Sequence, residues 1–262
     1  MSLSRRSFSC CCIRRVWALS SSTLRFVAGV IRAHRKKARV RWRRVTAGRQ
    51  ALMTLAYLHK GETYACLAVG FEVSVSTVFR RVNETISLVA ARAPGLVKVL
   101  RRAKRRGVPY VILDGTLIHG DRVAVDHPYY SGKHRTDGVN VQAITAPDGD
   151  LLWTSGALPG SVHDTAAARI WRIPTYLRET GMPTLADKGY TGLDDQNIAT
   201  PWKGRDKPGP KKTQNRTQAR LRAPGERGFA ELKKWRILRR LRCSTHRATI
   251  IVRAITVINH TG

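Results

Sequence analysis

The sequence predicts an all-α region followed by an α/β region built around one sheet, and three observations support this prediction. Apolar residues at helical spacing, with Ser and Thr at capping positions, recur up to residue 106. From Tyr110 onward, short apolar runs that suit buried strands are mixed with helical segments. Between the two regions, Gly107-Val108-Pro109 breaks any helix. We therefore expect a disordered basic extension over residues 1–20, a helical domain over 21–106 and an α/β domain over 107–262.

The first 20 residues are rich in Ser and Arg and contain no carboxylate. This composition is similar to that of a transit peptide, but the continuous apolar stretch of a secretion signal is missing. We expect a disordered extension and assign it no function. The segment that follows, Thr23 to Arg44, has apolar residues at helical spacing among many Lys and Arg and no Glu. An ordinary surface helix carries some acids, so we expect this basic helix to face phosphate groups.

The next segment has the plan of a helix-turn-helix. An apolar stripe from Ala51 to Leu58 predicts a first helix, and Thr63 can cap a short second helix that ends at Gly70. After a tight turn, Ser74 can cap a third helix. In such a unit the third helix contacts DNA, and the outward residues here are Ser74, Ser76, Thr77, Arg80 and Arg81. A three-helix packing unit without a DNA role is the alternative.

The α/β region contains several strand candidates and three helices. The strand candidates are 110–113, 122–125, 139–145, 151–153 (after the turn at 147–150) and 184–186. The helix candidates are 163–172, 223–241 and 245–259, and a basic loop is expected over 203–215. Strands first, then mixed strands and helices, indicate an α/β core around one sheet.

The charge is distributed unevenly along the chain. The total is +31, but residues 111–200 have a net charge of −4, whereas 1–61, 62–110 and 201–262 have +15, +6 and +14. A large excess of cations indicates a polyanion as partner, with nucleic acid as the first candidate. No run approaches the roughly 18 apolar residues of a membrane span, so we expect no membrane association. Basic flanks around an acidic centre are typical of a nucleic-acid enzyme that uses metal.

Three carboxylates are candidate metal ligands. Asp114 and Asp187 follow apolar strand candidates, and ligands bind at the carboxyl ends of strands in open α/β sheets. Glu226 lies at the start of an otherwise basic helix, with Lys233 about 20° away around the helix axis. Three such carboxylates can hold two Mg²⁺ roughly 3.5–4 Å apart for phosphoryl transfer. The alternative is that each Asp only caps a turn.

Several short motifs occur together in a characteristic order. They are Leu-Asp-Gly-Thr (113–116), Tyr-Ser-Gly-Lys-His (130–134), Asn-Val-Gln (140–142), Pro-Gly-Ser-Val-His-Asp (159–164), Ala-Asp-Lys-Gly-Tyr (186–190) and Arg222-x3-Glu226-x6-Lys233. With these motifs the chain, over roughly residues 22–260, resembles the DDE transposases of bacterial insertion sequences. It is most similar to the branch with a helix-turn-helix before the catalytic domain, related to the Harbinger nucleases.

The resemblance implies an RNase H-like catalytic domain in which Asp114, Asp187 and Glu226 form the catalytic, metal-binding triad. Arg222 and Lys233 match the family's contacts to the DNA end. Asp164 matches a position that some Harbinger-like relatives use as a fourth acidic metal ligand, and its alternative role is to cap the Ala-rich helix that follows. Candidates for phosphate contact are Lys133, His134 and Lys188, with a solvated surface as the alternative.

The activity that the resemblance implies is transposition. Such a protein binds the terminal inverted repeats of its own insertion sequence, cleaves DNA strands with Mg²⁺ (or Mn²⁺ in its place) and joins the freed 3′-hydroxyl to target DNA. Holding two DNA ends together implies a homodimer or larger assembly on double-stranded DNA, in the cytoplasm of a bacterium at the nucleoid. The alternatives are a DNA-binding protein that has lost catalysis and an endonuclease without strand transfer.

Overall fold

The computed structural model describes residues 20–40, 43–120, 129–133, 135–193, 196–204 and 208–261. Three predictions therefore lie outside the described residues: the N-terminal extension up to residue 19, the strand at 122–125, and His134 as a phosphate contact. Within the described ranges, no helix combines the length and apolar character needed to cross a membrane.

The N-terminal part is all-α, as the sequence predicts. Its helices are α2 (Ser21–Lys37), α3 (Ala47–Lys60), α4 (Tyr64–Phe71) and α5 (Val75–Ala90). Each begins after a residue whose hydroxyl accepts a hydrogen bond from a backbone N–H in the first turn, and these capping residues are Ser20, Thr46, Thr63 and Ser74. The basic helix α2 ends at Lys37, so it is shorter than the segment up to Arg44 that the sequence predicts.

The second part contains a mixed sheet, which confirms the α/β prediction. The strands are β1 (Val111–His119), β2 (Tyr130–Ser131), β3 (Thr136–Thr145), β4 (Leu151–Thr154), β5 (Leu158–Pro159), β6 (Thr184–Ala186) and β7 (Ile198–Ala199). They are arranged in the order β2-β3-β1-β6-β7, and β4 and β5 also pair with β3. The central strand β1 is antiparallel to β3 and parallel to β6.

The prediction that Asp114 ends its strand is wrong. Strand β1 continues to His119, and Asp114 lies in its middle, opposite Ala143 of β3. The residues after Asp114 keep pairing with β3, and two of them, Leu117 and Ile118, are buried. Gly115-Thr116 has the composition of a turn, but pairing with a distant strand holds it extended. Asp187 does follow its strand directly, as predicted.

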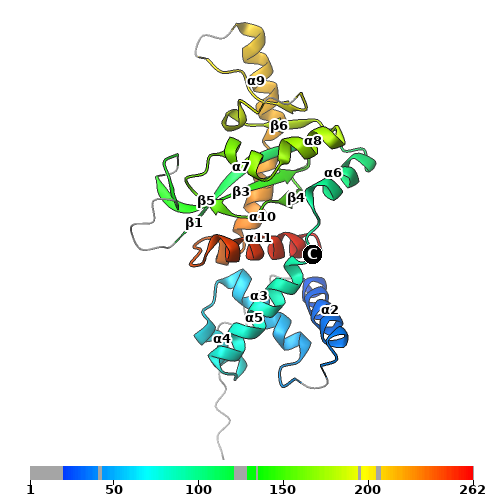
Figure 1. The fold of residues 1–262 in the computed structure, drawn as a ribbon, viewed down its shortest axis with the longest axis vertical. Helices are drawn as coiled ribbons and strands as arrows, with labels where there is room; N and C mark the ends of the chain where they lie inside the picture. The colour runs from blue at the N-terminus through cyan, green and yellow to red at the C-terminus, as the bar shows by residue number, and fades with distance from the viewer. Residues whose placement is uncertain are drawn as a thin grey trace, which may run out of the picture.

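Helices cover the sheet and complete the fold (Figure 1). They are α6 (Leu96–Arg105), α7 (Asp164–Ile170), α8 (Ile173–Thr180), α9 (Gly209–Arg222), α10 (Gly225–Lys233) and α11 (Thr245–Asn259), with short 3₁₀ helices η3 (Lys188–Tyr190) and η4 (Arg236–Leu238). Two expectations are corrected here. The basic loop gives way to α9 at Gly209, and the helix predicted over 223–241 ends at Lys233.

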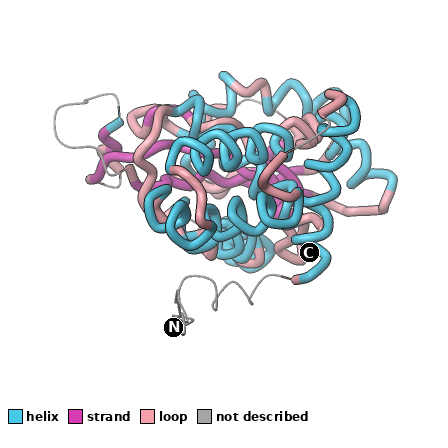
Figure 2. Tube along the Cα trace, turned by 90° about the horizontal axis from the view of Figure 1, so that it is seen from below, coloured by secondary structure: helices cyan, strands magenta, loops and turns pink. Residues whose placement is uncertain are grey.

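Two buried clusters hold the molecule together. One lies against the side of the sheet that carries Leu113 and Ile144, and includes residues of α6, α7 and α8. The other includes Phe229 of α10 and Ile255 of α11, and continues without interruption into the residues of α2, α3, α4 and α5. Figure 2, viewed from the helical end, shows these helices in front and the strands running across behind them. The position of the helical part relative to the sheet is therefore held by a shared core.

Candidate nucleic-acid interface and catalytic centre

The predicted DNA-contact residues lie at the N-terminal end of α5. The Ser74 hydroxyl accepts a hydrogen bond of 3.3 Å from the Thr77 N–H and also contacts the hydroxyls of Ser76 and Thr77. Ser74, Ser76 and Arg80 are exposed, and Thr77 is partly buried. The Arg80 Nε donates only a long bond, 3.4 Å, to the Ser76 carbonyl. This end of α5 therefore offers hydroxyls and one extended cation to a partner.

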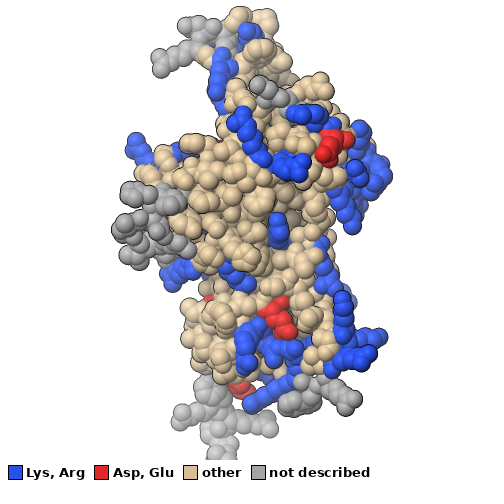
Figure 3. Space-filling view, in the orientation of Figure 1, with Lys and Arg blue, Asp and Glu red and all other residues tan. Residues whose placement is uncertain are grey.

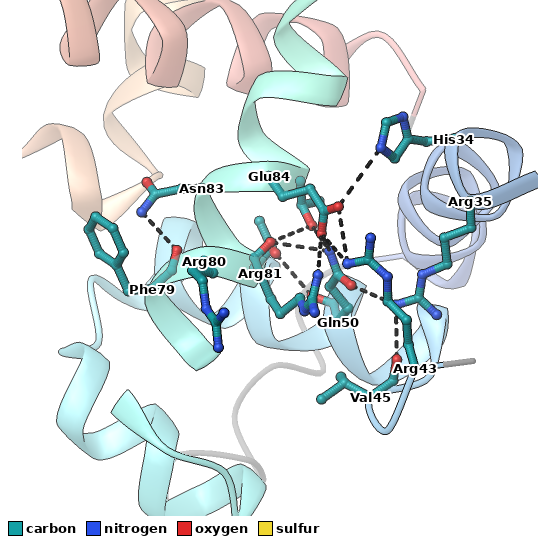
Figure 4. Close-up of polar contacts among 12 residues, drawn as sticks. His34, Arg35, Arg43, Val45, Gln50, Phe79, Arg80, Arg81, Asn83 and Glu84 are labelled. Carbon is teal, nitrogen blue, oxygen red and sulfur yellow. Dashed lines mark hydrogen bonds and ion pairs between the residues drawn. The ribbon is translucent and has the colours of Figure 1, made fainter. Parts of the chain in front are cut away.

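Arg81 differs from the other residues of this set because it is committed to the protein itself (Figure 4). Its Nη1 lies 3.2 Å from Glu84 Oε2, and Arg43 Nη1 lies 3.2 Å from Glu84 Oε1. Gln50 of α3 donates a 3.0 Å hydrogen bond to the same carboxylate, and His34 Nε2 of α2 lies 3.8 Å from it. Glu84 therefore joins α2, α3 and α5 through side chains that sequence reasoning did not connect.

The basic helix α2 keeps an outward cationic face. Arg25, Arg32 and Lys36 are exposed and share one side of the helix, whereas Arg35 is used internally. The Arg35 Nη2 donates to Gln50 Oε1 at 2.7 Å and to the Val45 carbonyl at 2.9 Å. On the face of the molecule drawn in Figure 3, Lys and Arg occur over both the helical part and the sheet part, with Asp and Glu in few places. This distribution suits a long polyanion that contacts both parts.

Asp164 lies in a polar pocket on the sheet. Its carboxylate accepts hydrogen bonds from Lys133 Nζ at 3.1 Å, Asn140 Nδ2 at 3.0 Å and Gln142 Nε2 at 3.3 Å. The buried Tyr190 hydroxyl donates to the Gln142 side chain and so fixes its orientation. The capping interpretation of Asp164 is wrong, because the N-cap of α7 is His163 and no side chain caps this helix.

Two glycines create the space that these carboxylates occupy. A Cβ at Gly115 would collide with the Asp164 carboxylate and with Gln142. A Cβ at Gly189 would lie 2.8 Å from Asp187 Oδ1 and 3.1 Å from Asp164 Oδ2. Gly115 and Gly189 therefore let Asp164 and Asp187 approach the backbone of β1 and η3. The Asp-Gly and Asp-x-Gly patterns are visible in the sequence, but the pairing of Asp164 with both glycines is not.

Asp187 caps the 3₁₀ helix that follows it, since its Oδ1 accepts a 2.7 Å hydrogen bond from the Gly189 N–H. Asp187 therefore does have the turn-capping role that was the alternative to metal binding. This role leaves the second carboxylate oxygen without a protein hydrogen bond among the described residues. A capping bond to one oxygen and a ligand bond from the other are compatible.

Asp114 shares this environment. Its Oδ1 accepts a 2.8 Å hydrogen bond from the Gly115 N–H. Burial raises the pKa of Asp114 to about 6, the Gly115 N–H and Arg222 oppose this rise, and the charges of Asp187 and Asp164 add to it. Asp114, Asp164 and Asp187 therefore interact electrostatically as one acidic group.

The remaining predicted site residues surround this group or lie away from it. A cavity of about 520 Å³ is lined by Asp164, Asp187, Lys133, Lys188 and Lys203, and His163 also borders it. Lys133 is paired with Asp164, and Lys188 is exposed. In this cavity three ammonium groups, which can receive phosphate oxygens, lie beside two carboxylates. Lys133 and Lys188 remain candidates for phosphate contact on this basis.

Glu226 and its helix partners are less closely connected to the aspartates. The nearby Arg222 influences Asp114, and its Nε is buried without a hydrogen-bond partner within the described ranges. Glu226 and Lys233 are exposed, at the first and last turns of α10. The Glu226 carboxylate makes no hydrogen bond or ion pair with any residue that the structure describes. The structure thus brings Asp114, Asp164 and Asp187 into one environment, and Glu226 has no hydrogen bond or ion pair that joins it to this group among the described residues.

The donor set suits a hard divalent cation. Carboxylate oxygens are the ligands that Mg²⁺ and Mn²⁺ take, and a cation would offset both the burial and the neighbouring negative charges that raise the pKa of Asp114. The spacing is not that of a closed cation site, because no group of three His, Cys, Asp or Glu within the described part of the chain is close enough to hold a metal ion. The chemistry therefore fits, and the ligands would have to draw closer together around an ion.

Comparison with known families identifies both parts of the chain. Residues 113–259 match the model of the DDE superfamily endonucleases, and residues 43–95 match the helix-turn-helix of the same superfamily. The chain belongs to the DDE superfamily of endonucleases. Members of this superfamily generally use a divalent metal. Searches of curated proteins and of solved structures gave no match. Helix α2 lies before the matched residues, so the match does not account for its basic face.

Proposed function

We propose that this DDE endonuclease is the transposase of an insertion sequence. It binds the terminal inverted repeats of its own element through α5, cuts DNA strands there with Mg²⁺, and joins the freed 3′-hydroxyl to target DNA. The observation that carries the proposal is the acidic group of Asp114, Asp164 and Asp187, of which the last two line a cavity together with three lysines, within a strongly cationic protein. Neighbouring carboxylates repel one another and so do not stabilise the fold. An enzyme that holds metal cations against DNA, by contrast, needs such a group.

In the proposed mechanism each group has a distinct task. Ser76, Thr77 and Arg80 contact the DNA, and Lys133 and Lys188 receive its phosphates at the cavity. Asp114 and Asp187 would be the main ligands of Mg²⁺, with Asp164 as a further ligand if Lys133 turns to phosphate. A bound Mg²⁺ would supply Lewis acidity for phosphoryl transfer.

Glu226 completes this set in the proposal, with Arg222 and Lys233 as contacts to the DNA end. Glu226 lies in the first turn of α10, directly after α9, so a small movement of this helix pair would change its distance from Asp114. The nucleophile is water and then a 3′-hydroxyl, so no covalent bond forms between protein and DNA. Two ends are cut together, which requires at least a dimer.

The test is strand cleavage of a DNA fragment that carries the inverted repeats flanking the reading frame. We expect Asp114→Asn and Glu226→Gln each to abolish cleavage with Mg²⁺ while binding of the fragment persists. Asp150→Asn, an exposed aspartate in the turn between β3 and β4, is the matched control and should cut normally. Cleavage by the Asp114→Asn variant at the normal rate would exclude the mechanism.

A second candidate function is DNA binding without catalysis. Two observations favour it: Lys133 is paired with Asp164 at 3.1 Å, and the described carboxylates form no cluster of three metal ligands. Specific binding of the inverted repeats by the wild-type protein, with no cutting in either Mg²⁺ or Mn²⁺, would support this function. Cutting without joining to target DNA would identify an endonuclease that does not transpose.

A further inference from the structure

A second cavity lies where the helical part meets the C-terminal part of the chain. It has a volume of about 570 Å³. One wall consists of the end of α3 and the start of α4, and the other of the segment that contains η4. Its lining residues include Tyr57, Lys60, Glu62, Tyr64, Arg236 and Arg240. We call this space the seam cavity.

The seam cavity is strongly cationic. Lys60 and four arginines line it, and Glu62 is the single carboxylate among its lining residues. Arg236 and Arg240 are exposed, and their guanidinium groups have no hydrogen-bond or ion-pair partner among the described residues. Cations gathered at short range repel one another, and folding gains nothing from placing them together. A polyanion that enters the cavity would remove this repulsion.

One wall is connected to the helix proposed to read DNA. The rings of Tyr57 and Tyr64 are stacked, with centroids 5.0 Å apart and an angle of 7° between them. The edge of Tyr64 in turn meets Phe79 of α5, with centroids 5.5 Å apart. Phe79 is 53% exposed, on the same helix as Arg80. The aromatic series therefore leads from the seam cavity to the outer face of α5.

The other wall is connected to β1, the strand that carries Asp114. The Leu241 N–H donates a 2.9 Å hydrogen bond to the His119 carbonyl, and Gly120 and Leu241 form a β-bridge. Asp114 lies on the same strand, five residues before His119, or about 17 Å at the rise of an extended chain. Figure 1 shows the segment before α11 directly below the end of β1 and above α3 and α4. The seam cavity thus lies between α5 and the acidic group of Asp114, Asp164 and Asp187.

We propose that the seam cavity binds the phosphodiester backbone of DNA on its path from α5 to the acidic group. This rests on the proposed function, in which one DNA molecule contacts both parts. Arg236 and Arg240 would contact phosphates, and the shared core beneath them would fix the distance between the bound sequence and the cut. The ligand class is the sugar-phosphate backbone, which the arginines contact without reading bases.

The test uses a fluorescent random-sequence 30-bp duplex, with binding measured in EDTA at several salt concentrations. The slope of log affinity against log salt is negative, and each lost phosphate contact reduces its magnitude by about 0.9. The double variant Arg236→Gln/Arg240→Gln should therefore have a slope whose magnitude is smaller by about 2. The control Arg101→Gln/Arg105→Gln removes the same charge from the exposed side of α6 and should leave the slope nearly unchanged. Equal slopes for both double variants, beside a steep wild-type slope, would overturn the proposal.

Two further measurements keep the result interpretable. Arg236→Lys/Arg240→Lys keeps the charge and should retain the wild-type slope, and a loss as large as that of the Gln variant would instead indicate a structural role. The melting temperature of every variant shows whether it is folded. If the wild-type slope itself is close to zero, the proposed DNA function fails as a whole. A steep wild-type slope with unchanged Gln variants contradicts only the seam cavity.

Discussion

Two groups of partly buried carboxylates in this protein are treated in opposite ways. In the helical part, Glu84 lies within 3.2 Å of both Arg43 and Arg81 and also accepts a hydrogen bond from Gln50. In the sheet, burial raises the pKa of Asp114 to about 6, and the nearby charges of Asp187 and Asp164 add to this rise. Lys133 is the one residue within the described ranges that forms an ion pair with this group.

The difference indicates what each group is for. A buried carboxylate surrounded by cations and amides supports the native structure, because removing it leaves those partners unpaired. Carboxylates that repel one another weaken the native structure until a cation binds. The helical part is therefore built to be stable before DNA arrives, whereas the acidic group retains an electrostatic cost that a metal ion would relieve.

The largest expected effect comes from breaking the Glu84 network. Glu84→Ala leaves Arg43, Arg81 and Gln50 without their common partner, and since the Glu84 side chain is 22% exposed we expect a loss of about 2–3 kcal/mol, below the value for a fully buried pair. Urea unfolding at pH 7 measures this. Glu231→Ala removes the exposed pair with Lys234 and should cost less than about 0.5 kcal/mol. Equal losses for the two variants would contradict the comparison.

The next effect concerns Asp114 and has the opposite sign. Its pKa is about 6 in the folded protein and 3.8 when unfolded, so the folded state holds the proton more tightly. Stability of the metal-free protein should therefore decrease as pH rises from about 4 to 6 and stay lower above that. Two pKa units correspond to about 3 kcal/mol at most. Asp114→Asn should remove this cost and make the inactive variant more stable than wild type at pH 7.5.

The measurement is chemical unfolding in EDTA at several pH values, expressed as the difference between wild type and Asp114→Asn. This difference should be large at pH 7.5 and become small below about pH 3, where Asp114, with a pKa of about 6 folded and 3.8 unfolded, is mostly protonated in both states. Asp150→Asn, whose side chain is exposed, controls for the loss of one negative charge. A difference that is independent of pH would show that folding does not raise the pKa of Asp114 as described.

The features that sequence could predict are those determined by neighbours in the chain. Thr63 and Ser74 cap α4 and α5 through bonds to residues three positions later, so the helix-turn-helix was predictable. The length of β1 was not, because β3 holds Gly115-Thr116 extended from a distance. Arg81 was predicted to face DNA from its position in the helix, but it pairs with Glu84. Glu84 also binds Arg43, which lies 41 residues away in the chain, and no local pattern shows this contact.

The site shows the same division between local and distant causes. The three predicted aspartates could be named from short motifs, and the structure brings them together. Asp164 accepts hydrogen bonds from Lys133, Asn140 and Gln142. All three residues belong to the short motifs of the sequence, but the sequence predicted a role for Lys133 alone. The position of Glu226 depends on how α10 packs, which no local pattern determines.

The smallest expected effect is stabilisation by the metal itself. Mg²⁺ at ten times its dissociation constant should add about 1.4 kcal/mol to the wild-type protein, because it binds the folded state alone. The gain should be larger at pH 7.5 than at pH 5, where Asp114, with a pKa of about 6, is mostly protonated. It should disappear in Asp114→Asn and persist in Glu231→Ala, whose lost carboxylate lies on the far turn of α10. Thermal melting with and without Mg²⁺ measures all three. An equal gain in the Asp114→Asn variant would mean that the ion binds elsewhere, and the acidic group would then need another explanation than metal binding.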